Sequence, residues 1–342
     1  MKSLLILQNE IMEYRKPVYN GLAEHYDVTV FHSGLPSVTV KDTYYEVIAP
    51  YKRIGPFFIQ PHSSLRERLD RSDVVIAMFD LRWPSYLLPL LRDQRPKYIL
   101  WGQRYSRNSL ANAVRDRLIN MADRLLMYGD EEVEQMITRG VDPHKFVLAP
   151  NTIHVANHAD YSDAPKSSLL FVGRLQTRKR VDLLIETFAH LLGRIGEGVR
   201  LDIVGDGEMQ NDLKQLAAKH HLLHKVVFHG RIDDPEILAR IFSQAYAYVS
   251  PSPVGLGVLH SLAYGVPVIT LRNVRHGPEF HNLVDGKNAI ICEDMDEIEK
   301  AMEKVCTDQT FSTELGRNAY QRYVGERTLV KMLEGFRKAI DE

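Results

Sequence analysis

Residues 169–188 read LLFVGRLQTRKRVDLLIETF and contain the most informative junction of the chain. The apolar run predicts a β-strand that ends at Val172, a turn at Gly173 and a helix directly after the basic segment. Arg174 and Lys179 lie in this connection, at the carboxyl end of a strand, where doubly wound sheets bind their ligands. Two cations there suit a pyrophosphate, because Arg grips it bidentately and Lys acts as a compact charge. A solvated basic loop is the alternative.

The same alternation of short apolar runs and helical periodicity extends over the whole sequence. Strands are expected at 3–7, 28–31, 74–77, 98–100, 124–127 and 146–149, and again at 168–172, 200–204, 226–228, 247–249, 267–270 and 289–292. Helical patterns lie between them, for example at 17–25, 108–121, 181–195, 209–220, 234–244 and 295–305. Strands that alternate with helices form parallel sheets covered on both faces, and right-handed crossovers make each half doubly wound. The predicted fold class is therefore α/β, with two Rossmann-like domains.

A polar, turn-rich segment near 150–167 interrupts this alternation. The chain has 342 residues, more than one domain usually contains, so two domains are expected. We place the N-terminal domain at 1–153, the C-terminal domain at 166–311 and a last helical segment at 312–342.

The net charge of −1 argues against general nucleic-acid binding. Residues 92–124 are locally basic, however, with Arg92, Arg95, Lys97, Arg104, Arg107, Arg115, Arg117 and Arg124 against Asp93, Asp116 and Asp123. Such a stretch is either a solvated helix face or a surface that meets an anionic lipid or an anionic acceptor.

The chain has two cysteines, Cys292 and Cys306, which form no disulfide framework and match no metal-ligand spacing. This favours a reduced, cytoplasmic compartment. The apolar run near the N-terminus is too short for a signal peptide, and no run approaches the length of a membrane span. Any membrane contact is expected to be peripheral, at the inner face of the membrane.

A second informative stretch, residues 250–270, reads SPSPVGLGVLHSLAYGVPVIT. It predicts a strand end, a turn in which Gly255 and Gly257 let the backbone approach a ligand, and a short helix over 258–264. Helix N-termini favour phosphate groups, and His260 lies in the first turn. A histidine at such a place is either a structural residue or a ligand contact, and the two readings stay open.

Two further segments are less specific. Gly205-Asp206-Gly207 closes a strand, but Gln210 stands where the dinucleotide fingerprint needs a third glycine, so a tight turn without a ligand is the simpler reading. The loop at 275–290 carries His276, Glu279 and His281, whose spacing fits no metal-ligand pattern. No metal is expected.

Taken together, these stretches resemble retaining, sugar-nucleotide-dependent glycosyltransferases of family four. Gly173-Arg174-Leu175 followed by Lys179 resembles the Gly-Arg-Leu-x-x-x-Lys signature of that family, and Val204-Gly205-Asp206-Gly207 resembles its Val-Gly-x-Gly strand end. The segments FHGRIDDPEILARIFSQAYAYVSPS, from residue 228, and LAYGVPVIT, from residue 262, are similar to two further family segments in the same order. The joint agreement over 165–295 is more specific than any single motif.

The resemblance implies the GT-B architecture, two Rossmann-like domains that face a central cleft, and it implies site residues. Arg174 and Lys179 would bind the donor diphosphate and stabilise the leaving nucleotide, so no metal would be needed. The donor contacts implied are Gly173, Arg231, Ile232, Gly255, Leu256, Gly257, Ser261 and Glu279. The only co-substrate implied is a nucleoside-diphosphate sugar.

One departure concerns the two glutamates, seven residues apart, that the family usually has in this loop. The second falls on His260, and the first falls on Ser252, or on Val254 with a gap. The loop resembles a subgroup that has Val-Gly-Leu and His-Ser here. His260, counted with Arg174 and Lys179 as catalytic, would bond ribose or sugar hydroxyls.

The N-terminal half resembles the acceptor domain of the family less closely. EYRKPVYNGLAEHYDVTVF at 13–31 is similar to its opening, and WGQRYSRNSL at 101–110 to a later loop. The acceptor-side residues implied are Arg15, Asp80, Gln103 and Arg104. For Asp80, which follows a predicted strand, a helix cap is an equal alternative. In GT-B folds the last helix returns to the N-terminal domain, which would assign that role to 312–342.

The predicted function is transfer of a sugar, with retained configuration, from a nucleoside diphosphate to a glycan, lipid-linked or small-molecule acceptor. A sugar-nucleotide epimerase or hydrolase of the same fold is one alternative, with His260, His276 or Glu279 near the sugar. A non-catalytic sugar-nucleotide-binding protein is another, favoured by the missing glutamates and opposed by the intact Arg174 and Lys179. A nicotinamide-dependent oxidoreductase is a further alternative. Gln210, which stands where the dinucleotide fingerprint has its third glycine, argues against it.

Overall fold

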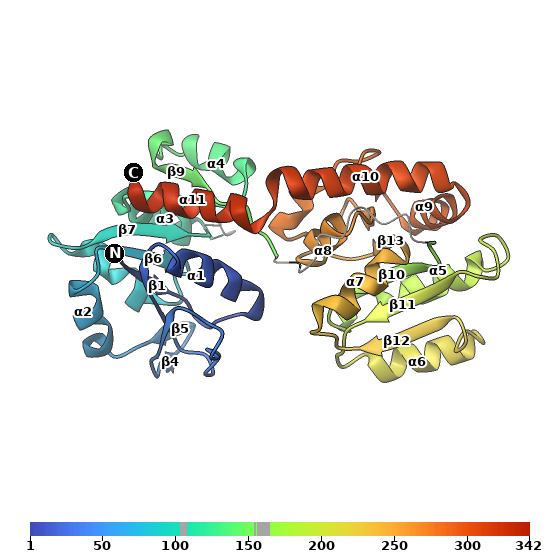
Figure 1. Cartoon of the computed structure of the whole chain (residues 1–342), viewed down its shortest axis with the longest axis horizontal. Helices are drawn as coiled ribbons and strands as arrows, with labels where there is room; N and C mark the ends of the chain where they lie inside the picture. The colour runs from blue at the N-terminus through green and yellow to red at the C-terminus, as the bar shows by residue number, and fades with distance from the viewer. Residues whose placement is uncertain (103–107, 154, 156–164) are drawn as a thin grey trace. The chain divides into compact units, whose positions relative to one another are not determined.

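The computed structural model describes residues 1–102, 108–153, 155 and 165–342 (Figure 1). The chain forms two compact units. Unit 1 comprises Met1–His154 together with Leu329–Glu342, and unit 2 comprises Val155–Thr328. Each unit is a parallel α/β sheet with helices on both faces, so the predicted fold class is confirmed.

Unit 1 contains a seven-stranded sheet in the order β3-β2-β1-β6-β7-β8-β9. The strands are β1 (Ser3–Leu7), β2 (Asp27–His32), β3 (Tyr45–Ile48), β6 (Val74–Met78), β7 (Lys97–Trp101), β8 (Arg124–Met127) and β9 (Phe146–Leu148), all paired in parallel. A separate antiparallel hairpin consists of β4 (Lys52–Ile54) and β5 (Phe57–Ile59). The sequence did not predict β3 or this hairpin, because none of the three strands contains a buried apolar run.

Both faces of this sheet are buried, as successive side chains of a strand point to opposite sides. Leu4 and Ile6 face the side covered by α1 (Lys16–Ala23) and α11 (Leu329–Asp341). Leu5 and Leu7 face the other side, which is covered by α2 (His62–Asp70), α3 (Ser109–Met121), α4 (Asp130–Ile137) and the 3-10 turns at 84–91.

Unit 2 contains a six-stranded parallel sheet in the order β12-β11-β10-β13-β14-β15. The strands are β10 (Ser168–Val172), β11 (Arg200–Val204), β12 (Val226–Gly230), β13 (Ala245–Ser250), β14 (Val268–Leu271) and β15 (Ala289–Cys292). The strand order reverses between β10 and β13. Such a switch point is where open α/β sheets bind ligands, outside the carboxyl ends of the strands.

One face of this sheet packs against α5 (Val181–Leu191), α6 (Gln210–Lys219) and α9 (Met295–Thr307), around a core that includes Phe188 and Met302. The remaining helices of unit 2 are α7 (Pro235–Ser243), α8 (Gly257–Ala263) and α10 (Gln309–Glu326). Among them, α8 packs against α10.

The last helical segment, expected as one piece at 312–342, is divided between the units. Its first part, α10, belongs to unit 2, and its second part, α11, belongs to unit 1. The helix is interrupted at Arg327, where φ is −122°, before α11 begins at Leu329. No helix in the part of the chain that the structure describes is long and apolar enough to cross a membrane.

Candidate active site

Three loops at the carboxyl ends of β10, β13 and β14 are tied to one another. The Lys179 ammonium, in the loop after β10, donates to the backbone oxygen of Pro253, in the loop after β13. The backbone N–H of Val254 donates to Nδ1 of His276 at 3.2 Å, and the N–H of Gly277 donates to the oxygen of Val254 at 3.0 Å. The structure thus brings these loops together around the switch point between β10 and β13.

Gly205 and Gly207 support the loop that carries the cations. A Cβ placed on Gly205, where φ is +134°, would lie 1.9 Å from the backbone oxygen of Gly173, and one on Gly207 would lie 2.4 Å from that of Leu175. The Leu175 N–H donates to the oxygen of Asp206 at 2.7 Å. The glycines therefore allow two backbone segments to touch, a supporting role that the sequence reading as a tight turn did not predict.

The segment 174–180 is strongly basic. Arg178 bonds the side chain of Gln176, and Arg180 pairs with Asp182. Within the residues described, the side chains of Arg174 and Lys179 have no carboxylate partner. Burial and the neighbouring charge of Arg178 lower the pKa of Lys179. This arrangement leaves two uncompensated cations at the switch point, as an anion site requires.

The glycines of the 255–257 loop have different surroundings. A Cβ on Gly257 would lie 2.8 Å from the hydroxyl oxygen of Tyr248, which itself donates to the oxygen of Val172 at 3.4 Å. Around Gly255 no atom of the described residues lies within 4 Å of such a Cβ. The backbone at Gly255 is therefore open to a ligand, whereas Gly257 lies close to β13.

His260 lies in α8 and stacks on Phe242 of α7, with ring centroids 6.0 Å apart. Its Nδ1 is enclosed and has no hydrogen-bond partner among the residues that the structure describes. Burial lowers the pKa of His260 to about 4, so the ring is neutral near pH 7. A neutral imidazole can bond a hydroxyl, but it does not supply the negative charge of a glutamate.

Glu279 approaches the loop in which the family pattern has its first glutamate. A Cβ on Gly277 would lie 2.8 Å from Oε2 of Glu279 and 3.2 Å from the oxygen of Val254, so the carboxylate lies beside this loop. His276 stacks on Phe280 at 4.0 Å and contacts the backbone oxygen of Leu271 through Nε2 at 2.7 Å. Burial, together with the charge of Lys179, lowers the pKa of His276. His276 thus orders the loop as a neutral ring.

The other predicted donor residues are less clearly part of this site. The Ser261 hydroxyl donates to the backbone oxygen of Val266 at 2.7 Å and is buried, so it closes the turn after α8. Arg231 is exposed just beyond β12 and pairs with Asp233 at 2.9 Å, and Ile232 is half-buried beside it. Their roles toward a donor remain predictions.

Of the predicted acceptor-side residues, Arg15 and Asp80 lie in the described part of unit 1, and Gln103 and Arg104 lie outside it. Arg15 is buried and donates to the Tyr128 hydroxyl at 3.0 Å. Asp80 accepts both the backbone N–H and the guanidinium of Arg82, each at 2.9 Å. Burial alone would raise the pKa of Asp80, but these bonds lower it, so the carboxylate stabilises a local turn.

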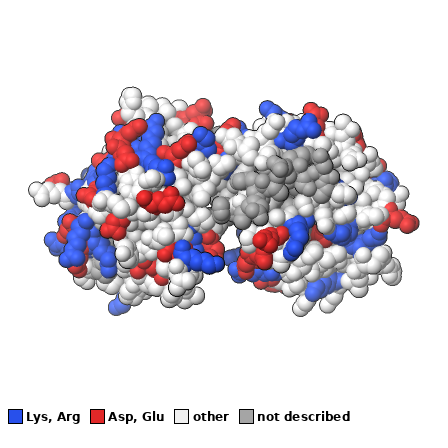
Figure 2. All heavy atoms as spheres, viewed as in Figure 1, with Lys and Arg blue, Asp and Glu red and all other residues white. Residues whose placement is uncertain are grey.

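The basic stretch at 92–124 is partly neutralised within unit 1. Arg92 pairs with Asp70 at 2.7 Å, and Arg95 pairs with Asp123. Lys97 donates to the backbone oxygen of Ile340 at 3.2 Å. On the face drawn in Figure 2, basic and acidic side chains are intermixed over both units. The sequence reading of this stretch as a surface for anions therefore gains no support from these residues.

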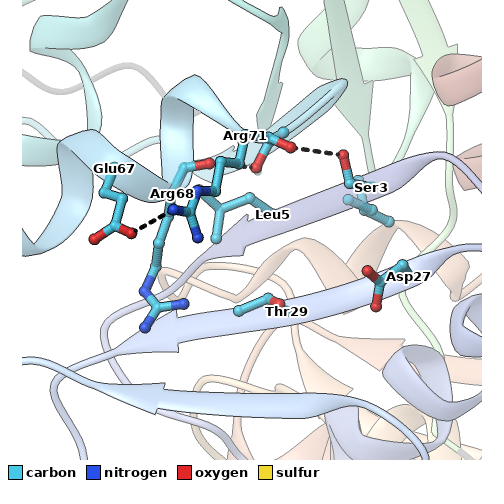
Figure 3. Close-up of a pocket in the computed structure, with 9 residues that line it drawn as sticks. Ser3, Leu5, Asp27, Thr29, Glu67, Arg68 and Arg71 are labelled. Atoms are coloured by element: carbon cyan, nitrogen blue, oxygen red, sulfur yellow. Dashed lines mark hydrogen bonds and ion pairs between the residues drawn. The ribbon is translucent and has the colours of Figure 1, made fainter.

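A polar pocket of about 250 Å³ opens at the amino ends of β1 and β2 (Figure 3). Its lining includes Ser3, Asp27 and Thr29 from the sheet, and Glu67, Arg68 and Arg71 from α2 and its end. Glu67 pairs with Arg71 at 2.9 Å, and the Ser3 hydroxyl donates to the backbone oxygen of Arg71 at 3.0 Å. The Ser3 contact joins the end of α2 to the amino end of β1, opposite to the carboxyl ends of the strands.

Among the described residues, no group of three or more His, Cys, Asp or Glu side chains is placed to hold a metal ion. The basic segment 174–180 begins two residues after the end of β10, so its cations lie close to the switch point. Two cations without a carboxylate partner are suited to bind an anion, and the roles of His260 and Glu279 beside them stay predictions.

Residues 159–322 match the family described as "Glycosyl transferases group 1". The lipopolysaccharide core biosynthesis glycosyltransferase LpsE of Rhizobium meliloti is 30% identical over 167 residues, 48% of this chain and 46% of that protein. A GalNAc-transferase of Campylobacter jejuni that acts on an undecaprenol-linked glycan is 23% identical over 334 residues, 89% of this chain and 87% of its own length. Both relatives are named as glycosyltransferases.

The likeness in structure concerns the fold. The crystal structure of Anabaena Alr3699/HepE in complex with UDP has a TM-score of 0.76 at 15% identity and covers 99% of both chains. Solved glycosyltransferases of the GT-B class thus share the two Rossmann-like domains. The chain spans about half the length of the first curated relatives that it matches, 46% and 53%.

Proposed function

We propose that this chain is a glycosyltransferase that moves a sugar from a nucleoside-diphosphate sugar to an acceptor, with retention and without a metal. The observation that carries the proposal is the pair Arg174 and Lys179, which have no carboxylate partner among the described residues and lie at the switch point of the unit 2 sheet. A bound diphosphate would supply the negative charge that this loop lacks. The match to glycosyl transferases group 1 over 159–322 includes both residues.

Arg174 and Lys179 would act on the leaving group. As the bond between the sugar and the diphosphate breaks, negative charge grows on the phosphate, and fixed cations stabilise it without reorganisation. Lys179 is already held by Pro253, so its ammonium is oriented before a donor arrives. The open backbone of Gly255, together with the neighbouring Leu256, would contact the phosphate or the sugar.

His260 and Glu279 would together replace the two glutamates that the family usually has. Glu279 lies beside the backbone of Val254, one of the two positions where the first glutamate is missing, and would contact the donor sugar. His260, neutral near pH 7, would bond a ribose or sugar hydroxyl. The chain would thus belong to a subgroup in which a histidine replaces the second glutamate and the first is absent from the loop.

For the nucleotide, we propose uridine diphosphate as the first to test, because the Anabaena protein was crystallised with UDP. Arg231 and Ile232, which follow β12, would face the base. For the acceptor, the relatives that act in lipopolysaccharide core biosynthesis and on an undecaprenol-linked glycan favour a glycan or a lipid-linked sugar. Unit 1 would hold it, with Arg15 and Asp80 as the described candidates.

In such a retaining reaction the departing phosphate itself helps to take the proton from the acceptor hydroxyl. The enzyme then needs no protein nucleophile, and its contribution is positioning and charge stabilisation. The comparisons do not favour the alternatives of an epimerase or hydrolase and a non-catalytic protein, since the named relatives are transferases.

The first test measures binding of UDP, GDP and ADP by isothermal titration, with and without EDTA. The proposal expects one nucleotide to bind, EDTA to have no effect, and the double variant Arg174→Ala with Lys179→Ala to lose at least about tenfold in affinity. Arg178→Ala is the matched control, because Arg178 belongs to the same loop but bonds Gln176. It should bind as the unaltered chain does.

Binding of none of the three nucleotides, or equal binding by the double variant, would overturn the donor site. A second measurement separates the reaction classes. NMR of the product, formed from the matching nucleotide sugar and a mixture of glycan acceptors, should show a glycoside with the anomeric configuration of the donor. Free sugar or an altered sugar nucleotide in the absence of acceptor would instead indicate a hydrolase or an epimerase.

A further inference from the structure

The hairpin β4–β5 of unit 1 is a two-stranded ribbon outside the main sheet (Figure 1). Its register pairs Lys52 with Ile59, Arg53 with Phe58 and Ile54 with Phe57. Because directly opposite residues of a ribbon share a face, Arg53 and Phe58 lie on one side, and the other four lie on the opposite side. The two faces differ in what they contact.

The face with Phe58 is anchored to unit 1. The Phe58 ring stacks on Trp83 with centroids 5.0 Å apart and meets Tyr51 edge-on at 5.5 Å. The Phe58 N–H donates to the backbone oxygen of Arg82 at 2.7 Å, and Trp83 stacks in turn on the buried Tyr86. An isolated hairpin has little stability of its own, so this aromatic stack fixes the ribbon and the direction of its outer face.

The outer face is apolar although it is exposed. Ile54 is 60% exposed, Phe57 43% and Ile59 38%, and they share the face with Lys52. Tyr51, just before the ribbon, is also exposed. A solvated ribbon would place polar side chains here and apolar ones inside. Clustered large apolar side chains on a rigid, exposed element mark an interaction surface.

The charge of this region has one sign. Between Val47 and Arg66 the sequence has no Asp or Glu, whereas Lys52 and Arg53 flank the apolar tip. Arg53 lies 5.9 Å from the Phe58 ring. The carboxylate of Asp80 lies near the hairpin, because the backbone oxygen of Arg82 accepts from Phe58. It is paired with the Arg82 guanidinium, so its charge is balanced. Apolar and aromatic side chains bordered by cations, without acids, are complementary to an anionic lipid surface.

We propose that the outer face of the β4–β5 hairpin docks on an anionic lipid bilayer. Ile54, Phe57 and Ile59 enter the boundary between headgroups and acyl chains, and Lys52, which shares this face, contacts the anionic headgroups. The hairpin follows β3, so it lies at the carboxyl-end side of the unit 1 sheet, where the acceptor is proposed to bind. Docking itself does not depend on sugar transfer, and its test needs no substrate.

The test uses the full chain and flotation with vesicles of phosphatidylcholine alone or mixed with phosphatidylglycerol. The chain should float with the mixed vesicles, and less so as salt is raised, since salt screens headgroup charges. The variant Ile54→Ser with Phe57→Ser should lower the fraction bound by about tenfold or more, because both side chains leave apolar contact. Lys52→Glu should weaken the preference for the mixed vesicles, because it reverses the charge of the cation on the outer face.

The matched control replaces two exposed apolar residues of the same unit, Leu110→Ser with Val114→Ser, on α3 within the basic stretch. It should bind vesicles as the unaltered chain does. The proposal is overturned if the unaltered chain does not float with mixed vesicles at low salt, or if the α3 variant loses binding and the hairpin variant keeps it.

Gel filtration with light scattering tests the other occupant, a second copy of the chain. The unaltered chain and the hairpin variant should have the same mass in the absence of lipid. A dimer that only the Ile54→Ser, Phe57→Ser variant disrupts would assign the hairpin to self-association and would overturn lipid docking. Circular dichroism of each variant establishes that a loss of binding is not a loss of fold.

Discussion

The guanidinium of Arg15 lies 4.6 Å from the ring centroid of Trp101, and only 7% of the Arg15 residue is exposed. Tyr14 and Tyr128 approach the same guanidinium at 5.0 and 5.6 Å. In the part of the chain that the structure describes, no carboxylate pairs with Arg15. The faces of aromatic rings therefore take the place of a counter-ion, and they join the start of α1 to the ends of β7 and β8.

Removing the charge of Arg15 should destabilise unit 1. Arg15→Met keeps much of the side-chain volume but loses the cation–π contacts and the bond to Tyr128, so the free energy of unfolding should fall by about 2 kcal/mol. The free energy of unfolding of Arg15→Lys should lie between those of the unaltered chain and Arg15→Met, since an ammonium keeps the charge but does not stack as a planar group. Both tryptophans, Trp83 and Trp101, lie in unit 1, so the fluorescence change in urea reports this unit. Equal midpoints for all three chains would contradict the role given to Arg15.

Replacing Gly205 should disturb the loop that carries the cations. The Cβ of Gly205→Ala would meet the backbone oxygen of Gly173 at 1.9 Å, and its φ of +134° is rarely adopted by other residues. Because two backbones cannot remain in contact, the variant should lose about 2–4 kcal/mol of stability and most of its nucleotide affinity. Differential scanning calorimetry with and without UDP measures both.

Gly193→Ala serves as the comparison for this variant. No atom of the described residues lies within 4 Å of a Cβ at Gly193, and its φ is not positive. It should unfold and bind UDP as the unaltered chain does. A Gly205→Ala chain that binds UDP equally well would show that the loop does not depend on the contact with Gly173.

Protonation of His260 should couple folding to pH. Burial lowers the pKa of His260 from 6.5 to about 4, so between these values the unfolded chain binds a proton that the folded chain does not. Stability is therefore fully present above about pH 6.5 and falls as the pH is lowered toward 4. His260→Phe, which keeps the stack on Phe242, should flatten this decline.

The melting temperature of unit 2, followed by calorimetry from pH 7 to pH 4, measures this effect. His224→Gln, at an exposed position outside α8, is the control and should keep the slope of the unaltered chain. His260→Phe should also be more stable at pH 5, because it removes the enclosed and unpartnered Nδ1. Parallel slopes for His260→Phe and the unaltered chain would contradict the burial of this ring.

The sequence predicted the two parallel sheets because each central strand contains a run of buried apolar residues, as in β1 and β10. It failed where strands are exposed. β3, with the sequence YEVI, and both strands of the β4–β5 hairpin have no fully buried residue, so their patterns do not differ from those of loops. The last helix was read as continuous because Arg327 and Thr328 do not break helices by themselves.

The place of the two cations in the fold was predictable for the same kind of reason. Arg174 and Lys179 follow a strand directly, so their place at its carboxyl end is local information. The contact of Lys179 with Pro253 joins residues 74 positions apart and depends on the pairing of β10 with β13. The hydrogen-bond partners of hydroxyl and carboxyl groups were the least predictable, because the conformation of the local turn decides which group lies nearest. The Ser261 hydroxyl, for example, donates to the backbone oxygen of Val266 in the turn after α8.

The close packing of α11 against β9 depends on Gly335. A Cβ at this position would lie 2.1 Å from the backbone oxygen of Leu148 and 2.8 Å from Cα of Ala149, neither of which can move as a side chain would. Gly335→Ala should therefore push α11 away from β9 and cost about 2–3 kcal/mol, more than the helix propensity of alanine returns. Phe336, the next residue, packs edge-on against Trp101 at 4.9 Å, so tryptophan fluorescence in urea reports the change directly. Gly325→Ala in α10, which meets no atom of the described residues within 4 Å, should leave that transition unchanged, and equal midpoints for both variants would contradict the close contact of α11 with β9.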